Sequence, residues 1–203
     1  MAASSFVHRF IVTFLAICLV VGQALAGDSE RARLYNQWNE KCLHGTVETV
    51  DSYILKLQGQ LQSNPNDELA RAFLGSAFAL RAKHGWWGPT KLSNLREGKK
   101  HLDEAVNRDP NNARVRLVRA VGFSRVPKKF GVRKTALRDF NQLITTARRG
   151  SASGLTVSER QAVFFLGATA WEKEGKDAKG LYRECLALGK DTKYGKQATA
   201  ALR

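Results

Sequence analysis

The sequence predicts an all-α protein, and three observations lead to this prediction. Apolar residues recur three and four positions apart, which is the spacing that places them on one face of a helix. No stretch after residue 26 alternates convincingly between apolar and polar residues, as a half-buried strand does. A pattern of small and aromatic residues also recurs at fixed distances from two prolines, which indicates that the helices form repeated units.

Eight stretches carry the helical spacing. In one of them Val50, Ile54 and Leu57 are three or four positions apart and share one helix face. The stretches span residues 38–43, 47–61, 69–80, 95–106, 115–121, 136–144, 163–171 and 181–186. A further short helix is expected after Gly189. Hydrophobic residues make up 43% of the chain, which is enough to bury a core between these helices.

The segments between the helices contain typical boundary residues. Residues 64–67 read Asn-Pro-Asn-Asp and residues 109–112 read Asp-Pro-Asn-Asn. Proline ends one helix and the asparagine or aspartate that follows caps the next. Further along, Thr156 or Ser158 begins a helix together with Glu159.

A local pattern recurs after each proline. A helix begins at the same distance from Pro65 and Pro110, and a small residue is followed three positions later by an aromatic one. The small residues are Gly75 and Ala120, and the aromatic residues are Phe78 and Phe123. Residues 165–171 carry a third copy without a preceding proline. Small residues at a helix crossing allow two helices to approach closely, and large ones fill the space between units.

This pattern resembles the tetratricopeptide repeat (TPR), a helix-turn-helix unit of about 34 residues. The matching residues are Leu74, Gly75 and Phe78, then Leu102, Ala105 and Pro110, and finally Ala178, Tyr182 and Cys185. The resemblance implies a short right-handed superhelix of three to four TPR-like helix-turn-helix units. It also implies a concave surface, lined mainly by the first helix of each unit, that binds a partner.

The chain departs from the family period in its middle. Pro65 and Pro110 are about 45 positions apart, roughly 11 more than one repeat. We expect the additional residues to lie in an inserted loop at residues 83–93.

Residues 1–26 have the organisation of a cleavable secretory signal peptide. Arg9 precedes an apolar run at residues 10–21, and the small residues of Ala24-Leu25-Ala26 suit a cleavage site. The alternative is an uncleaved anchor, although the run is shorter than the ~20 residues that span a membrane. We expect residues 27–203 to form a single exported domain, in the periplasm of a Gram-negative bacterium.

The chain is strongly basic, with a net charge of +15, or +14 without the leader, whose only charged residue is Arg9. Export argues against a nucleic-acid partner, so anionic lipids, glycans, wall polymers or an acidic protein surface are expected. An exported compartment permits a disulfide between Cys42 and Cys185. The alternative is two small buried residues.

Arg114 and Arg125 are candidate binding residues on the concave surface that the TPR resemblance implies. Arginine binds carboxylates and phosphates well because its planar fork donates two parallel hydrogen bonds. The alternative is that both are solvated helix residues.

Two segments between the expected helices are further candidates. Trp86 and Trp87 lie in residues 83–91, where glycine and proline favour a loop. Aromatic rings beside cations are common in recognition surfaces, and the alternative is that both rings fill the core. Residues 127–134 form a basic segment that meets an anionic surface or serves as a solvated linker. Its candidate binding residues are Lys128, Lys129, Phe130 and Arg133.

Catalysis has little support in the sequence. No zinc-protease, serine-hydrolase or nucleotide-binding motif is present, and we expect no catalytic residue, metal or cofactor. Two functional hypotheses follow. The chain is a non-catalytic adaptor or scaffold for an envelope protein, or it binds an anionic lipid, glycan or cell-wall polymer through its basic segments.

Overall fold

The computed structural model describes residues 27, 29–84 and 88–203, and all regular structure in these residues is helical. The chain divides into two compact units, Met1–Leu34 and Tyr35–Arg203. In the first unit, the described residues 27 and 29–34 are helical, and the predicted signal peptide lies outside the described residues.

The second unit confirms the all-α prediction, because each of the eight predicted stretches lies within a helix. Residues 35–44 are helical. The elements that follow are α2 (Val47–Ser63), α3 (Glu68–His84), α4 (Gly88–Arg108), α5 (Ala113–Arg125), η1 (Lys128–Phe130), α6 (Arg133–Ala147), η2 (Gly150–Ser153), α7 (Val157–Glu172), α8 (Lys179–Ala187) and α9 (Lys193–Ala201). The elements η1 and η2 are short 3₁₀ turns.

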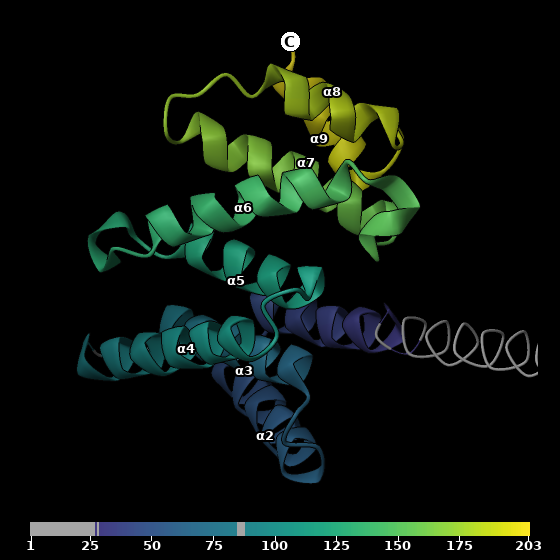
Figure 1. Ribbon diagram of the computed structural model, residues 1–203. Coiled ribbons are helices and arrows are strands. Elements are labelled where there is room, and N and C mark those ends of the chain that lie inside the picture. Colours follow the sequence, from purple (N-terminus) through teal and green to yellow (C-terminus); the bar gives the residue numbers. More distant parts are fainter. Residues whose placement is uncertain (1–26, 28, 85–87) are drawn as a thin grey trace, which may run out of the picture. The chain divides into compact units, whose positions relative to one another are not determined.

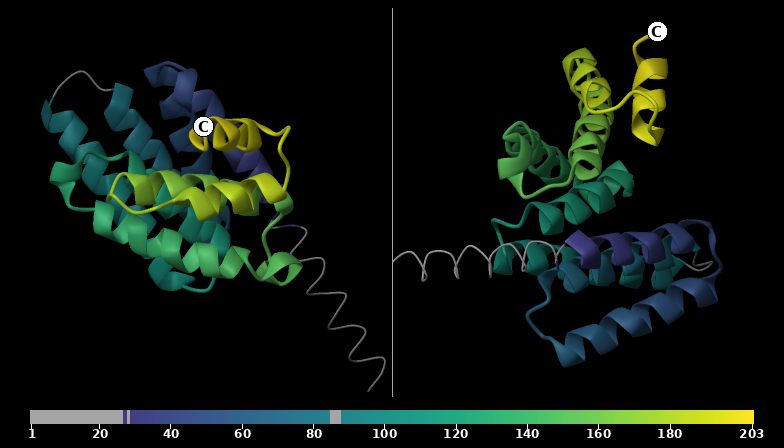
Figure 2. Two further views of the ribbon diagram at one scale, coloured as in Figure 1. Left: turned by 90° about the horizontal axis from the view of Figure 1, so that it is seen from above. Right: turned by 90° about the vertical axis from the view of Figure 1, so that its right-hand side faces the viewer.

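Helices that are consecutive in the chain pack against each other (Figure 1). The most extensive contacts pair α3 with α4 and α5 with α6, and α7 packs on both α6 and α8. The first helix of each pair also contacts the first helix of the next, α3 with α5 and α5 with α7. The final helix, α9, lies against α7 and α8 (Figures 1 and 2).

The contact between α3 and α4 depends on two glycines. A Cβ atom at Gly75 would lie 2.7 Å from the carbonyl oxygen of Gly98, and a Cβ at Gly98 would lie 2.7 Å from that of Gly75. The two backbones therefore approach closely where they cross, which confirms the role predicted for the small residue Gly75. Gly98, its partner on α4, was not predicted.

Helix starts are capped largely as the sequence predicts. The Asn112 side chain accepts hydrogen bonds from the backbone N–H groups of Arg114 and Val115, at 3.0 and 3.2 Å. At α7, Thr156 and Glu159 form a reciprocal capping box, so Thr156 rather than Ser158 is the cap. These hydrogen bonds satisfy N–H groups that would otherwise have no partner at the helix ends.

The prediction of an inserted loop at residues 83–93 is wrong for most of this range. Helix α3 continues to His84 and α4 begins at Gly88, so the additional residues largely lengthen two helices. Proline is compatible with the first turn of a helix, where its missing N–H has no intrahelical acceptor, and Pro89 lies in that turn. Trp86 and Trp87 lie outside the described residues.

Cys42 and Cys185 are free and fully buried. Of the two possibilities for this pair, the structure therefore shows two small buried residues with free thiols. Burial raises the pKa of the Cys185 thiol to about 11, and the nearby Gln161 partly offsets this shift. A thiol with a raised pKa is a weak nucleophile at neutral pH.

Candidate partner-binding site

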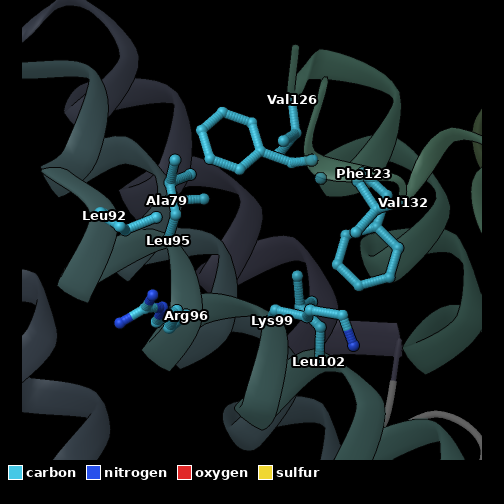
Figure 3. A pocket seen from close by; sticks show the side chains of 11 residues that line it. Ala79, Leu92, Leu95, Arg96, Lys99, Leu102, Phe123, Val126 and Val132 are labelled. Carbon is cyan, nitrogen blue, oxygen red and sulfur yellow. The ribbon is translucent and has the colours of Figure 1, made fainter. Parts of the chain in front are cut away.

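An apolar pocket of about 180 Å³ lies between α4 on one side and the end of α5 with the segment that follows it on the other (Figure 3). Ala79 of α3 also contributes to its wall. The residues from α4 are Leu92, Leu95, Arg96, Lys99 and Leu102, and those from the other side are Gly122, Phe123, Val126, Phe130 and Val132. Figure 3 shows Arg96 and Lys99 on the α4 side, with Phe123, Val126 and Val132 opposite.

The local sequence explains why a pocket forms here. After Val126 the chain turns through η1, and Gly131 ends this turn with a φ of 72°, a conformation that favours glycine. The turn brings Val132 back into the protein, where it is 6% exposed, and leaves Phe130 half-buried. Gly122 adds no side chain to the wall, and a Cβ there would lie 3.3 Å from Leu102.

The charged residues that line the pocket are both cations. Lys99 is paired with Asp103 of its own helix, with 2.6 Å between Nζ and Oδ2. Arg96 is exposed and has no ion-pair partner within the described part of the chain. No carboxylate lines the pocket, so an incoming anionic group meets an uncompensated guanidinium at its edge.

The residues on the other side of the pocket belong to a segment without acidic residues. Residues 113–138 contain nine lysines and arginines and no aspartate or glutamate. Four of these cations form ion pairs with carboxylates from other segments: Arg114 with Glu159, Arg116 and Arg119 with Asp139, and Arg133 with Glu174. The other five are exposed and have no ion-pair partner among the described residues.

Four of these five cations are close in sequence to residues that line the pocket. Together with Arg96, each either lines the pocket or is within two positions of a lining residue. We call this set the basic rim: Arg96, Arg125, Lys128, Lys129 and Lys134. The Nζ atom of Lys129 also lies 5.5 Å from the centre of the Phe130 ring, which places a cation beside an aromatic lining residue.

The sequence-predicted candidates therefore separate into three groups. Phe130 lines the pocket, and Arg125, Lys128 and Lys129 belong to the basic rim. The other two arginines are engaged within the chain: Arg114 with Glu159, and Arg133 with Glu174 at 3.4 Å. Trp86 and Trp87 lie outside the described residues.

The ion pair of Arg114 is buried and bidentate. Its Nε and Nη2 atoms donate to the two oxygens of Glu159 at 2.7 and 3.1 Å, and Arg114 is only 8% exposed. A guanidinium held in this way is not free to bind a partner. We therefore do not include Arg114 in the candidate site.

A second buried ion pair holds α5 against α6. Asp139 is fully buried and accepts two hydrogen bonds of 2.8 Å from Arg119 and one of 3.1 Å from Arg116. Arg119 also donates to Asp103, the partner of Lys99, at 3.1 Å. Burial alone lowers the pKa of Arg119, but its hydrogen bonds and charge interaction with Asp139 outweigh burial and raise it.

The α4 side of the pocket was not predicted as part of a binding site. Leu95, Arg96 and Leu102 were placed in a predicted helix and Leu92 in the expected inserted loop, none of them as a binding residue. The available signal was the surplus of residues between the two prolines, which lengthens α4 beyond its partner. Leu92, which lines the pocket, is 37% exposed.

The titratable groups of the described residues do not converge in this pocket. His101 lies on α4, where its ring stacks on Phe78 with centroids 5.7 Å apart. Burial lowers the pKa of His101, and Glu97 and Glu104 partly oppose that shift. No group of three or more histidine, cysteine or acidic residues within the described ranges is arranged to hold a metal ion.

Comparisons of the chain with known protein families, with curated proteins and with solved structures found no match. Among residues 27, 29–84 and 88–203, no helix combines the length and the apolar composition that a membrane span requires.

Proposed function

We propose that this chain is a non-catalytic, exported TPR-like protein that binds a partner protein as an adaptor or scaffold in the bacterial envelope. The observation that carries this proposal is the apolar pocket, which combines nine uncharged lining residues with a basic rim and lacks a carboxylate. An apolar anchor site surrounded by polar or charged residues is the usual organisation of a protein-binding hot spot.

The order of helix contacts supports a repeat architecture. Contacts between the first helices of consecutive pairs, α3 with α5 and α5 with α7, are those expected when helix pairs stack on one another. We infer a short right-handed superhelix of three to four TPR-like units. In this proposal the additional length of α4 and the turn at η1 supply the binding pocket.

A pull-down from detergent-solubilised envelope with the full chain tests the proposed function. The beads are washed at low and at high salt, because apolar contacts persist at high salt whereas surface charge interactions are screened. We expect a discrete protein that survives the high-salt wash and is lost with Leu92→Glu, which places a charge at the pocket. Leu55→Glu is the matched control, because Leu55 is an exposed leucine of α2 that does not line the pocket. Equal loss with both variants, or no retained protein, contradicts the proposal.

A second function is favoured by the basic rim. The five cations of the rim have no carboxylate partner among the described residues, so they suit an anionic lipid, glycan or cell-wall polymer. Binding of this kind depends on charge alone and weakens as salt increases. Recovery of only lipid or polysaccharide, released by salt and unaffected by Leu92→Glu, favours this function over the adaptor.

A further inference from the structure

We propose that the pocket receives one large apolar side chain from an acidic segment of the partner protein, while the basic rim binds the flanking carboxylates. This inference rests on the proposed function and specifies the chemistry of the partner. It combines two independent properties of the pocket, which are its volume and the sign of the charges around it.

The volume restricts the apolar part of the ligand. A pocket of about 180 Å³ is close to the ~150 Å³ of an engineered cavity that encloses benzene. It is smaller than the roughly 300–1,000 Å³ that encloses a drug-sized ligand. The pocket therefore matches a single phenylalanine, leucine or methionine side chain better than a lipid acyl chain, most of which would stay in water.

The charges restrict what surrounds that side chain. Arg96 is on α4, whereas Arg125, Lys128 and Lys129 flank the lining residues on the other side. Cations therefore belong to both walls, and a peptide that crosses the pocket meets positive charge before and after its apolar residue. Arg96 suits a carboxylate because its guanidinium donates two parallel hydrogen bonds.

The ion pairs beneath the pocket keep its walls fixed. Lys99 lines the pocket and binds Asp103, which binds Arg119, which in turn binds the buried Asp139 of α6. These contacts link α4, α5 and α6 around the pocket. A preformed pocket requires little reorganisation on binding, which favours recognition of a short peptide segment.

Fluorescence polarisation with the full chain and short synthetic peptides tests this inference. The probe is a fluorescein-labelled peptide with a central phenylalanine between runs of aspartate and glutamate. One matched peptide carries alanine in place of phenylalanine, and another carries serine in place of the acidic residues. We expect each change to weaken binding about tenfold or more, since a truncated anchor typically costs that much at a hot spot. Equal binding of the phenylalanine and alanine peptides would overturn the inference.

Variants of the chain separate the two contributions. Ala79→Leu fills the pocket with a side chain and leaves the charges in place, so we expect it to abolish the preference for phenylalanine over alanine. Lys128→Gln/Lys129→Gln removes two positive charges from the basic rim. Lys173→Gln/Lys179→Gln is the control, because it removes two exposed cations that lie outside the pocket. Only the first pair is expected to weaken binding of the acidic peptide, and circular dichroism confirms that each variant is folded. An unchanged preference in Ala79→Leu, or equal effects of the two lysine pairs, contradicts the inference.

The result is distinguishable from a failure of the proposed function. A partner retained in the pull-down and lost with Leu92→Glu, together with no binding of the acidic peptide, overturns only the inference about acidity. Vesicles of phosphatidylglycerol serve as a further probe. Binding to these vesicles that requires Lys128 and Lys129, without binding of the peptide, assigns the rim to a membrane surface and overturns the inference.

Discussion

The buried ion pair at Asp139 provides the sharpest test of how this fold is stabilised. Asp139→Asn removes the negative charge but retains most of the volume of the side chain. Three hydrogen bonds from two arginines end on this carboxylate, which is fully buried. Removal of one partner of a buried ion pair leaves the other charge uncompensated and costs about 3–5 kcal/mol. We therefore expect the free energy of unfolding to fall by about that amount.

The pair of Arg148 and Glu184 is the matched control. It is also bidentate, with distances of 3.0 and 2.8 Å, but the two side chains are 54% and 33% exposed. Surface pairs of this kind contribute about 0–1 kcal/mol. Urea unfolding followed by circular dichroism compares Glu184→Gln with Asp139→Asn. The slope of the unfolding free energy against urea concentration should be the same for both variants and the unaltered chain. A loss below about 1 kcal/mol for Asp139→Asn, or equal losses for both variants, refutes the reasoning.

Three further predictions concern packing and titration. Gly75→Ala places a Cβ 2.7 Å from a backbone oxygen of α4 and should lower the free energy of unfolding by about 2–3 kcal/mol. Gly59→Ala, where the new Cβ meets no atom within 4 Å, should raise it by about 0.5–1 kcal/mol. Equal effects of the two variants in urea unfolding contradict a close crossing at Gly75. Burial lowers the pKa of His101 below 6.5, so the unfolded chain binds more protons and stability should fall as the pH drops below about 6.5. His101→Gln should reduce this pH dependence. If the free energy of unfolding of the variant changes with pH as steeply as that of the unaltered chain, His101 is not its source. The Cys185 thiol, with a pKa raised to about 11, should react with iodoacetamide much more slowly in the native protein than in urea at pH 8; similar rates contradict its burial.

The sequence predicted the helices well because local patterns determine them. The three-to-four-residue spacing located each helix from α2 to α8, and Asn112 and Thr156 mark the starts of α5 and α7 as expected. The close crossing at Gly75 also followed from residue size. The helical spacing and the caps depend on neighbouring residues in the chain, so one sequence is sufficient to predict them. The partner of Gly75 at the crossing, Gly98, lies on another helix and was not predicted.

The candidate site was only partly predictable, because it depends on contacts between distant residues. Lys128, Lys129 and Phe130 were identified from their local composition. The role of Arg114 was not, because its partner Glu159 lies 45 positions away and the pairing is visible only in the fold. The α4 wall was missed for a related reason, since the additional residues of 83–93 were expected in a loop and instead lengthen helices.

The position of Glu159 has a consequence for how this protein folds. Its carboxylate accepts the N–H of Thr156 at 2.7 Å and also holds Arg114, so it caps α7 and binds α5. In an array whose units contact only their neighbours, such a link makes each unit depend on the next. A chain that ends before α7 would leave Arg114 without its carboxylate. The helix pairs should therefore unfold as one cooperative system and should not be removable one at a time from the C-terminal end.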